Sequence, residues 1–161
     1  VNERPLLLLV NHWKSKSGGA EKSEVWRNFQ ESVLAQSFAE YEGKNIPVVA
    51  CGDFNRDILE FRKINGRKLQ FNVELRGENP ALVYSPWYDS GGNLFELGSY
   101  FYNGNWERID HFFAGSGANV SDFKVECKGN WSNADGSPSK YILKYGTGYS
   151  DHFPVSCVIS W

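Results

Sequence analysis

The sequence lacks several features that would mark whole classes of protein. No apolar run approaches the roughly 20 residues that a membrane-spanning helix needs. The run PLLLLV at residues 5–10 is short and has no basic region before it, so it is not a signal peptide. The net charge of −2 excludes a large basic surface that holds nucleic acid by charge alone, although a bound metal ion could supply positive charge. Repeats, low-complexity tracts and charged linkers are also absent, which favours one domain in 161 residues.

Cysteine is scarce, with three residues in the chain. Cys51 lies in an apolar stretch and is expected to be a buried thiol. Cys127 and Cys157 lie in stretches of alternating apolar residues and could pair across a sheet, but their spacing alone does not decide whether they do. Apolar residues are plentiful by comparison. They make up 41% of the chain and aromatic residues 16%, which is enough for a packed core and excludes a disordered chain.

The apolar pattern predicts a mixed α/β fold. Residues 5–11 and 45–52 are typical of buried strands, and residues 23–41 between them have the spacing of a helix, with Ser23 as its N-cap and Gly43 as its stop. A strand, a helix and a strand in this order predict a parallel crossover unit. The remaining expected elements are a short helix through Ile58, Phe61 and Ile64, two strands around a tight turn at residues 103–105, and strands at residues 119–127 and 152–161.

Polar side chains follow a predicted strand in the motif GDFN, residues 52–55. Asp53 could coordinate a hard cation or orient a water molecule, and Asn55 could contact a phosphoryl oxygen or hold that water. Sites outside the carboxyl ends of sheet strands are common in α/β proteins. The alternative is a simple Asx turn, because Gly, Asp and Asn all favour turns.

A second polar pair, Asp151 and His152, comes just before the last apolar run, in the motif SDHFPV. Asp151 could bind a metal ion. His152 could act as a general acid or base, since imidazole titrates near neutral pH. The alternative is a turn aspartate beside a half-buried histidine. Adjacent side chains of an extended chain point apart, so a loop would have to bring both to one site.

Two further candidates lie at strand boundaries. Asp110, in the motif NWERIDHFF, is expected to face inward, where a carboxylate needs a partner, either a histidine or a salt-bridging Lys or Arg. His12 follows the strand at residues 5–11 and could hydrogen-bond a phosphate oxygen. His111 shares a strand face with Ile109 and Phe113, so we expect it to be structural.

Together these residues resemble the motifs of the endonuclease/exonuclease/phosphatase superfamily. They occur in the order of that superfamily: NHWKS with His12, GDFN with Asp53 and Asn55, RID with Asp110, and SDHFPV with Asp151 and His152. The form NHWKSKSGG is most similar to bacterial predicted extracellular nucleases, which suggests a secreted or periplasmic protein. The resemblance implies a four-layer α/β sandwich, in which two mixed β-sheets face each other with helices outside.

The resemblance also implies hydrolysis of a phosphoester with Mg²⁺, or with Mn²⁺ or Ca²⁺ in its place. Asp53 would orient or deprotonate the attacking water. His152 would stabilise the developing negative charge or protonate the leaving group, and Asp110 would orient His152 or His12. The implied metal ligands are Asp53, Asn55 and Asp151, and the implied phosphate contacts are His12, Asn55 and Lys14.

One expected feature is missing from the sequence. The superfamily carries an early asparagine and a metal-binding glutamate in its first half, and no stretch here matches them. We therefore expect the chain to be the C-terminal half of the domain, partnered by an N-terminal half and otherwise monomeric. The expected substrate is nucleic acid, cleaved by an endonuclease or phosphodiesterase reaction. The alternatives are a phosphatase or sphingomyelinase-like reaction, and a non-catalytic fragment with a binding or structural role.

Aromatic residues near predicted loops are the remaining indication of a substrate, because they could stack bases or enter a lipid surface. We expect most of them to fill the core between sheets instead. These residues are Trp13, Trp87, Tyr88, Trp106 and Trp131.

Overall fold

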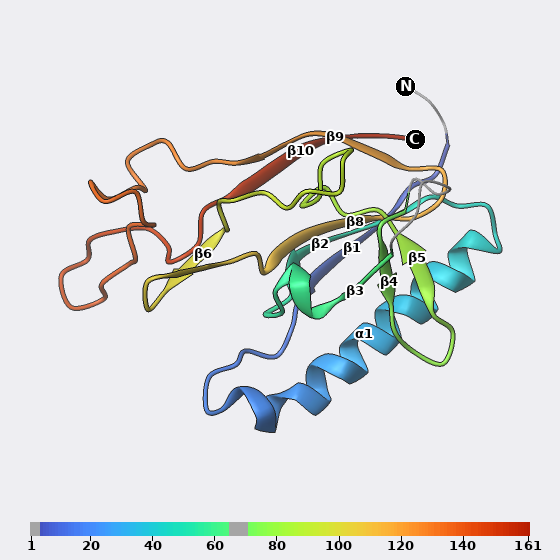
Figure 1. Cartoon of the computed structure of the whole chain (residues 1–161), viewed down its shortest axis with the longest axis horizontal. Coiled ribbons are helices and arrows are strands. Elements are labelled where there is room, and N and C mark those ends of the chain that lie inside the picture. Colours follow the sequence, from blue (N-terminus) through green and yellow to red (C-terminus); the bar gives the residue numbers. More distant parts are fainter. Residues whose placement is uncertain (1–3, 65–70) are drawn as a thin grey trace.

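A computed structural model describes residues 4–64 and 71–161 as a mixed α/β arrangement (Figure 1). This confirms the predicted fold class. The elements are β1 (Leu7–His12), α1 (Ala20–Glu42), β2 (Val48–Asp53), the short 3₁₀ helix η1 (Ile58–Glu60), β3 (Arg62–Lys63), β4 (Val73–Leu75), β5 (Ala81–Val83), β6 (Tyr100–Tyr102), β7 (Asn105–Glu107), β8 (Asp110–Ala114), β9 (Asn119–Val125) and β10 (Val155–Ser160). Among these described residues, no helix combines the length and apolar character that crossing a membrane requires.

The central sheet has the strand order β1-β2-β8. Strand β1 runs parallel to β2, and α1 connects them, which confirms the predicted crossover unit. Strand β8 is antiparallel to β2. The carboxyl ends of β1 and β2 therefore meet the amino end of β8 at one edge of the sheet, where polar side chains from all three strands can gather.

The central sheet lies between α1 and the antiparallel pair β9–β10 (Figure 1). On the side of α1, the main core joins Leu34, Ala35 and Phe38 of the helix to strand residues such as Ala50 and Phe113. On the other side, a smaller core contains Val49, Ala114 and Ala118, with Val120 and Ile159 packed against it. The helix, the central sheet and the β9–β10 pair thus form three layers, beside which lie the small sheets β3-β4-β5 and β6-β7. The outer helical layer of a four-layer sandwich stays a prediction.

The helix α1 begins earlier than predicted. It starts at Ala20 with Gly19 as its N-cap, and it ends at Gly43 as expected. Ser23 is not the cap. Its hydroxyl group instead donates to the carbonyl oxygens of Gly19 and Ala20 inside the first turn.

The face that α1 turns to the core also differs from the simple apolar pattern. Besides Leu34, Ala35 and Phe38, it buries Arg27 and Glu31. Of the apolar side chains on which the helical spacing rests, Phe38 is buried, but four are largely exposed: Val25, Trp26, Phe29 and Val33. The reason is a buried ion-pair network beneath the helix, in which Glu31 binds Arg56 and Arg76, so charge rather than apolar surface occupies part of the contact.

The prediction that the strand at residues 5–11, here β1, is fully buried is wrong. Its residues alternate between half-buried and exposed, with Leu8 50% and Val10 78% exposed. In the described part of the chain, β1 pairs with β2 alone and is therefore the edge of the central sheet. In addition, the face of this strand that carries Leu8 and Val10 has no covering layer within residues 4–64 and 71–161.

The middle of the chain departs from its predicted pattern in two places. The expected helix through Ile58, Phe61 and Ile64 is a single 3₁₀ turn, which begins with a capping box between Asp57 and Glu60 and ends in extended backbone at Phe61. The expected strand after the turn at residues 103–105 is divided into β7 and β8. The strands predicted at 119–127 and 152–161 are present as β9 and β10.

The cysteines are free thiols, and several of the aromatic residues singled out in the sequence are buried. Cys127 and Cys157 are not bridged, and Cys51 is half-buried. Trp13, Trp87 and Tyr88 are buried in the main core, which confirms their expected packing role.

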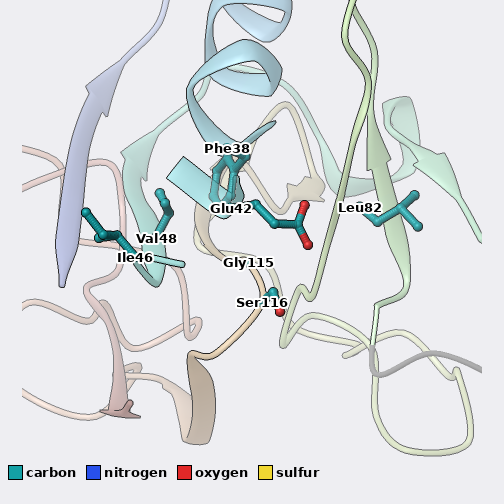
Figure 2. Close-up of a pocket in the computed structure, with 7 residues that line it drawn as sticks. All are labelled: Phe38, Glu42, Ile46, Val48, Leu82, Gly115 and Ser116. Carbon is teal, nitrogen blue, oxygen red and sulfur yellow. The ribbon is translucent and has the colours of Figure 1, made fainter. Parts of the chain in front are cut away.

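A small pocket lies where the C-terminal end of α1 meets β2 and the turn after β8 (Figure 2). Its volume is about 10 Å³, room for about one water molecule. A side chain at Gly115 would collide with the ring of Phe38, so close packing explains the glycine. We regard this pocket as a packing feature. A larger polar cavity lies at the opposite end of β2, beside Asp53.

Candidate active site

Three polar residues form a row across the end of the central sheet. The strand register places His12 of β1 beside Asp53 of β2, and Asp53 beside Asp110 of β8. Directly paired residues project from the same face of a sheet, and adjacent strands are about 4.8 Å apart. His12 Nε2 accordingly lies 3.6 Å from Asp53 Oδ2. The sheet therefore brings together groups that are nearly 100 positions apart in the sequence.

Asp110 holds His152 directly. The Nδ1–H group of His152 donates to Asp110 Oδ2 over 2.8 Å. The loop before β10 is fixed at this point, because the Phe153 N–H group donates to the Ser99 carbonyl oxygen over 2.6 Å. Of the partners left open by the sequence, the one that Asp110 binds is His152. This bond fixes the tautomer and leaves Nε2 available for chemistry.

Asp53 and Asn55 are locked together at the end of β2. The Asn55 backbone N–H donates to Asp53 Oδ1 over 2.8 Å, and Asn55 Nδ2 donates to Asp53 Oδ2 over 3.0 Å and to the Trp13 carbonyl oxygen over 3.1 Å. Asn55 has a φ of 47°, in the left-handed region that asparagine tolerates. The motif GDFN is thus an Asx turn, as the simpler interpretation expected, and it also presents both side chains at the edge of the sheet.

The pKa values of Asp53 and His152 are both raised above their ordinary values. Burial raises the pKa of Asp53, and the nearby charge of Asp110 adds to this, against the lowering effect of the Asn55 N–H group. Burial lowers the pKa of His152, but the hydrogen bond and charge of Asp110 outweigh it, so the pKa of His152 is raised. Asp53 is therefore a stronger base than a free carboxylate, and His152 keeps its proton more readily than a free imidazole.

A cavity of about 510 Å³ joins these residues. His12, Asp53, Asn55, Asp151 and His152 line it, and Asp110 stands behind His152. The structure therefore brings together all the candidate residues except Lys14. The Lys14 side chain is exposed, and its backbone N–H binds Gln30 on α1 instead.

Several residues of the cavity wall were not among the predicted site residues. Lys16 lines the cavity and forms ion pairs with Glu60 and Glu107 at 2.7 Å and 3.1 Å. Lys16 rather than Lys14 therefore lines the cavity. Side chains alternate in direction along the loop, so either lysine could have faced the cavity. The others are Ser15, Ser17, Tyr100, Tyr102, Ile109 and Lys140. The tyrosines and Lys140 lie outside the four motifs, so no signal beyond their aromatic or basic character could have indicated them.

The comparisons with known proteins agree with this geometry. The model of the Endonuclease/Exonuclease/phosphatase family matches residues 1–160. The chain belongs to this family. No curated protein matches the chain with significance. Members of the family are typically hydrolases of phosphoester bonds that use divalent metals.

The oxygen ligands in the active-site cavity suit a partly hydrated hard cation. Asp53 and Asn55 both line the cavity, and Mg²⁺ in proteins commonly keeps several waters beside one or two carboxylates. Within residues 4–64 and 71–161, however, no three His, Cys, Asp or Glu side chains are close enough to hold a metal ion. Asp151 is engaged elsewhere, because its Oδ2 accepts from Lys140 Nζ at 3.0 Å. The described donors would therefore hold such an ion only together with water and further oxygen ligands.

A buried network supports the active-site turn from below. Arg56, directly after Asn55, is fully buried and binds Glu31, Glu24 and Asn28 of α1. Its carbonyl oxygen accepts from His111 Nε2 at 2.8 Å. The turn that carries Asp53 and Asn55 is thus anchored to both α1 and β8, and His111 has the structural role expected of it.

Proposed function

We propose that this chain carries the general acid, the general base and the phosphate-contacting residues of a divalent-metal-dependent phosphodiesterase that cleaves nucleic acid. The supporting observation is the hydrogen bond between Asp110 and His152, whose imidazole faces Asp53 and Asn55 across a single cavity. A carboxylate-oriented histidine opposite a partly buried carboxylate is the arrangement that general acid–base hydrolysis requires.

In the proposed reaction, Asp53 accepts a proton from the attacking water while Asn55 holds that water in place. The water oxygen forms a bond to phosphorus as the bond to the leaving oxygen breaks. The protonated His152 then donates its Nε2 proton to the leaving oxygen, and Asp110 stabilises the imidazolium that precedes this step. His12, exposed at the cavity mouth, contacts a non-bridging phosphate oxygen.

The proposed metal ion is Mg²⁺, held by Asp53 and Asn55, with Asp151 as a ligand only if it releases Lys140. When bound, it would supply positive charge that neutralises the phosphate and lowers the pKa of coordinated water. Phosphoryl transfer depends mainly on such positioning and charge neutralisation.

We further propose that activity requires a second polypeptide portion, an N-terminal half of the same domain, which covers the free face of β1 and α1. A groove of about 500 Å³ runs between these elements, lined by apolar residues such as Leu8, Val10, Phe29 and Val33. His12 lines both this groove and the active-site cavity. A segment seated there would therefore reach the metal site and could add the missing oxygen ligands. With this face covered, we expect the protein to be monomeric.

The test uses the full natural protein with Mg²⁺ and a plasmid DNA substrate. Asp53→Asn and His152→Gln should each reduce the cleavage rate by about 100- to 10,000-fold, the usual contribution of a general base or acid. Asp110→Asn should reduce it by about 10- to 100-fold, because Asp110 acts through His152. Asp122→Asn, an exposed carboxylate of β9, is the matched control and should leave the rate unchanged.

Three outcomes would contradict the proposal. Full activity in His152→Gln would exclude the acid–base role of the histidine. Cleavage of a phosphomonoester or of sphingomyelin, with no cleavage of DNA or RNA, would favour the phosphatase or sphingomyelinase alternative. Absence of any hydrolysis in the full protein with Mg²⁺ or Mn²⁺ would favour a non-catalytic role.

A further inference from the structure

Tyr100 and Tyr102 line the active-site cavity, and further exposed tyrosines lie on a neighbouring segment. The first two lie on β6, and the other three lie in the segment between β9 and β10, which projects from the molecule beside β6 (Figure 1). We name this group the tyrosine rim: Tyr100, Tyr102, Tyr141, Tyr145 and Tyr149. Aromatic side chains are usually buried, so a group of rings that remain in solvent beside a catalytic cavity indicates a binding surface.

The rings of the two tyrosines of β6 form a row that extends away from the His152 ring. The Tyr100 ring lies 4.7 Å from the His152 ring, measured between centroids. The Tyr102 ring is 6.1 Å from that of Tyr100 and nearly parallel to it, at 9°. Residues two apart on a strand share a face, so β6 holds both rings in line. The outer ring, Tyr102, is 56% exposed and has a free face.

The other three tyrosines lie on a hairpin that backbone hydrogen bonds hold in shape. The Ile142 N–H donates to the Thr147 carbonyl oxygen over 2.7 Å, and the Tyr149 N–H donates to that of Ser139 over 2.7 Å. Tyr145 and Tyr149 are 65% and 59% exposed. Because the backbone rather than apolar packing maintains this hairpin, its rings are free to contact a ligand.

Basic side chains accompany the rings. Lys144 Nζ lies 5.2 Å from the centroid of the Tyr145 ring. Lys140 lines the cavity and pairs with Asp151. Phosphates spaced along a strand would meet these lysines while the intervening bases meet the rings, which is how proteins bind single-stranded nucleic acid.

We propose that the tyrosine rim binds a nucleic acid strand with unpaired bases, and that these bases belong to the nucleotides next to the scissile phosphate. The inference rests on the proposed function and adds to it a preference for single strands. A duplex offers no free base faces, because its bases already stack on one another. Contact with a lipid surface would explain why Ile142 and Leu143 of the hairpin are exposed. It does not explain the row of rings from His152 to Tyr102.

The test measures binding by the full natural protein in EDTA, where metal-dependent cleavage does not proceed. The probes are a fluorescently labelled single-stranded 12-nucleotide DNA and the same sequence as a blunt duplex, read by anisotropy. The double variant Tyr102→Ala/Tyr145→Ala should bind the single strand about 10- to 100-fold more weakly, since each stacked ring accounts for roughly a tenfold change in affinity. Tyr102→Phe/Tyr145→Phe keeps both rings and should bind within about threefold of the unaltered protein. Both tyrosines are exposed, so each variant should fold, which circular dichroism checks.

Each alternative result is decisive. Equal affinity of the alanine and phenylalanine variants for the single strand, or stronger binding of the duplex by the unaltered protein, would overturn the inference. So would a loss of binding to phosphatidylserine vesicles in the alanine variant without any loss for DNA. Hydrolysis of bis(4-nitrophenyl) phosphate with Mg²⁺ separates the two proposals, because this small diester needs the catalytic residues and not the rim. If the unaltered protein hydrolyses it, the proposed chemistry stands whatever the rim does.

Discussion

At the scale of single residues, adjacent positions of β8 have opposite roles. Asp110 binds His152, which lines the cavity, whereas His111 is fully buried on the other face and donates to the Arg56 carbonyl oxygen. Burial lowers the pKa of His111 to about 4, so this imidazole is neutral at physiological pH. His111 therefore contributes to stability while His152 contributes to chemistry.

Stability should depend on pH through His111. Its pKa is about 4 in the folded protein and near 6.5 when unfolded, so between these values protons bind preferentially to the unfolded chain. The stabilising contribution is complete above pH 6.5. It should be lost as the pH falls toward 4, which would lower the free energy of unfolding by up to about 3 kcal/mol. Urea denaturation at a series of pH values measures this. His111→Gln keeps a donor for Arg56 and should show a shallower decline, and an unchanged decline would contradict the assignment.

Gly52 is required by a close approach between β1 and β2. Its φ is 128°, and a Cβ atom there would overlap the Asn11 carbonyl oxygen. Gly52→Ala should therefore lower the free energy of unfolding by about 3 kcal/mol or more, through strain and displacement of β1. Gly104→Ala is the control, because Gly104 also has a positive φ but faces open space, and it should cost about 1 kcal/mol. Thermal denaturation compares the two, and equal losses would contradict the role of the close approach.

The candidate residues were predictable from the sequence where a short motif coincides with a strand end. Asp53, Asn55, Asp110 and His152 all have this property, and all of them meet at one cavity. The choice between Lys14 and Lys16 was not predictable. Both are loop lysines, and only the ion pairs of Lys16 with Glu60 and Glu107, from distant segments, determine which one faces the cavity.

At the scale of elements, α1 is attached to the active-site turn by charge. Glu31, nearly fully buried, binds the guanidinium groups of Arg56 and Arg76 and accepts the Arg76 backbone N–H at 2.8 Å. Arg56 also stacks near the rings of Trp13 and Phe61. The helix therefore supports the GDFN turn through a specific network rather than through a uniform apolar contact.

Breaking this network should lower the free energy of unfolding. Glu31→Gln leaves Arg56 as a buried charge without a full counter-charge, and the expected loss is about 3 kcal/mol in the free energy of unfolding. Glu40→Gln, which removes an exposed pair between α1 and Lys44, should leave the free energy of unfolding nearly unchanged, because water screens exposed ion pairs. Chemical denaturation of both variants measures the difference. A similar small loss in both would show that the network is not a significant source of stability.

The helix and the crossover unit were predictable from periodicity, but the orientation of the helix was not. Apolar spacing predicted the helix from residues that include Val25, Phe29 and Val33, and these side chains are exposed while Arg27 and Glu31 are buried. Periodicity reports which residues share a face. It does not report which face meets the rest of the described chain, and here tertiary ion pairs decided this.

At the scale of the whole molecule, the main feature is the largely apolar groove between the free edge of β1 and the neighbouring side of α1. Edge strands with exposed apolar side chains are prone to pair with other chains. The charge of the chain is only −2, which gives little electrostatic protection against association.

The 161-residue chain produced alone should consequently self-associate. The double variant Val10→Lys/Phe29→Lys places charges in this groove and should shift the chain toward monomer in size-exclusion chromatography with light scattering. Leu143→Lys is the matched control, because it charges an equally exposed apolar residue far along the chain, on the hairpin between β9 and β10. It should leave the association unchanged, and an equal effect of both variants would show that the β1–α1 groove is not the cause.

The row of His12, Asp53 and Asp110 has a consequence for how this protein can change over evolution. Its three members meet because two strand pairings have one specific alignment. Gaining or losing a single residue inside β8 would exchange Asp110 for Ile109 or His111 and remove the catalytic partner of His152. A length change in the turn at residues 103–104, outside that alignment, would leave the row intact. Natural insertions and deletions among homologous chains should therefore accumulate in the connecting turns and be excluded from β1, β2 and β8.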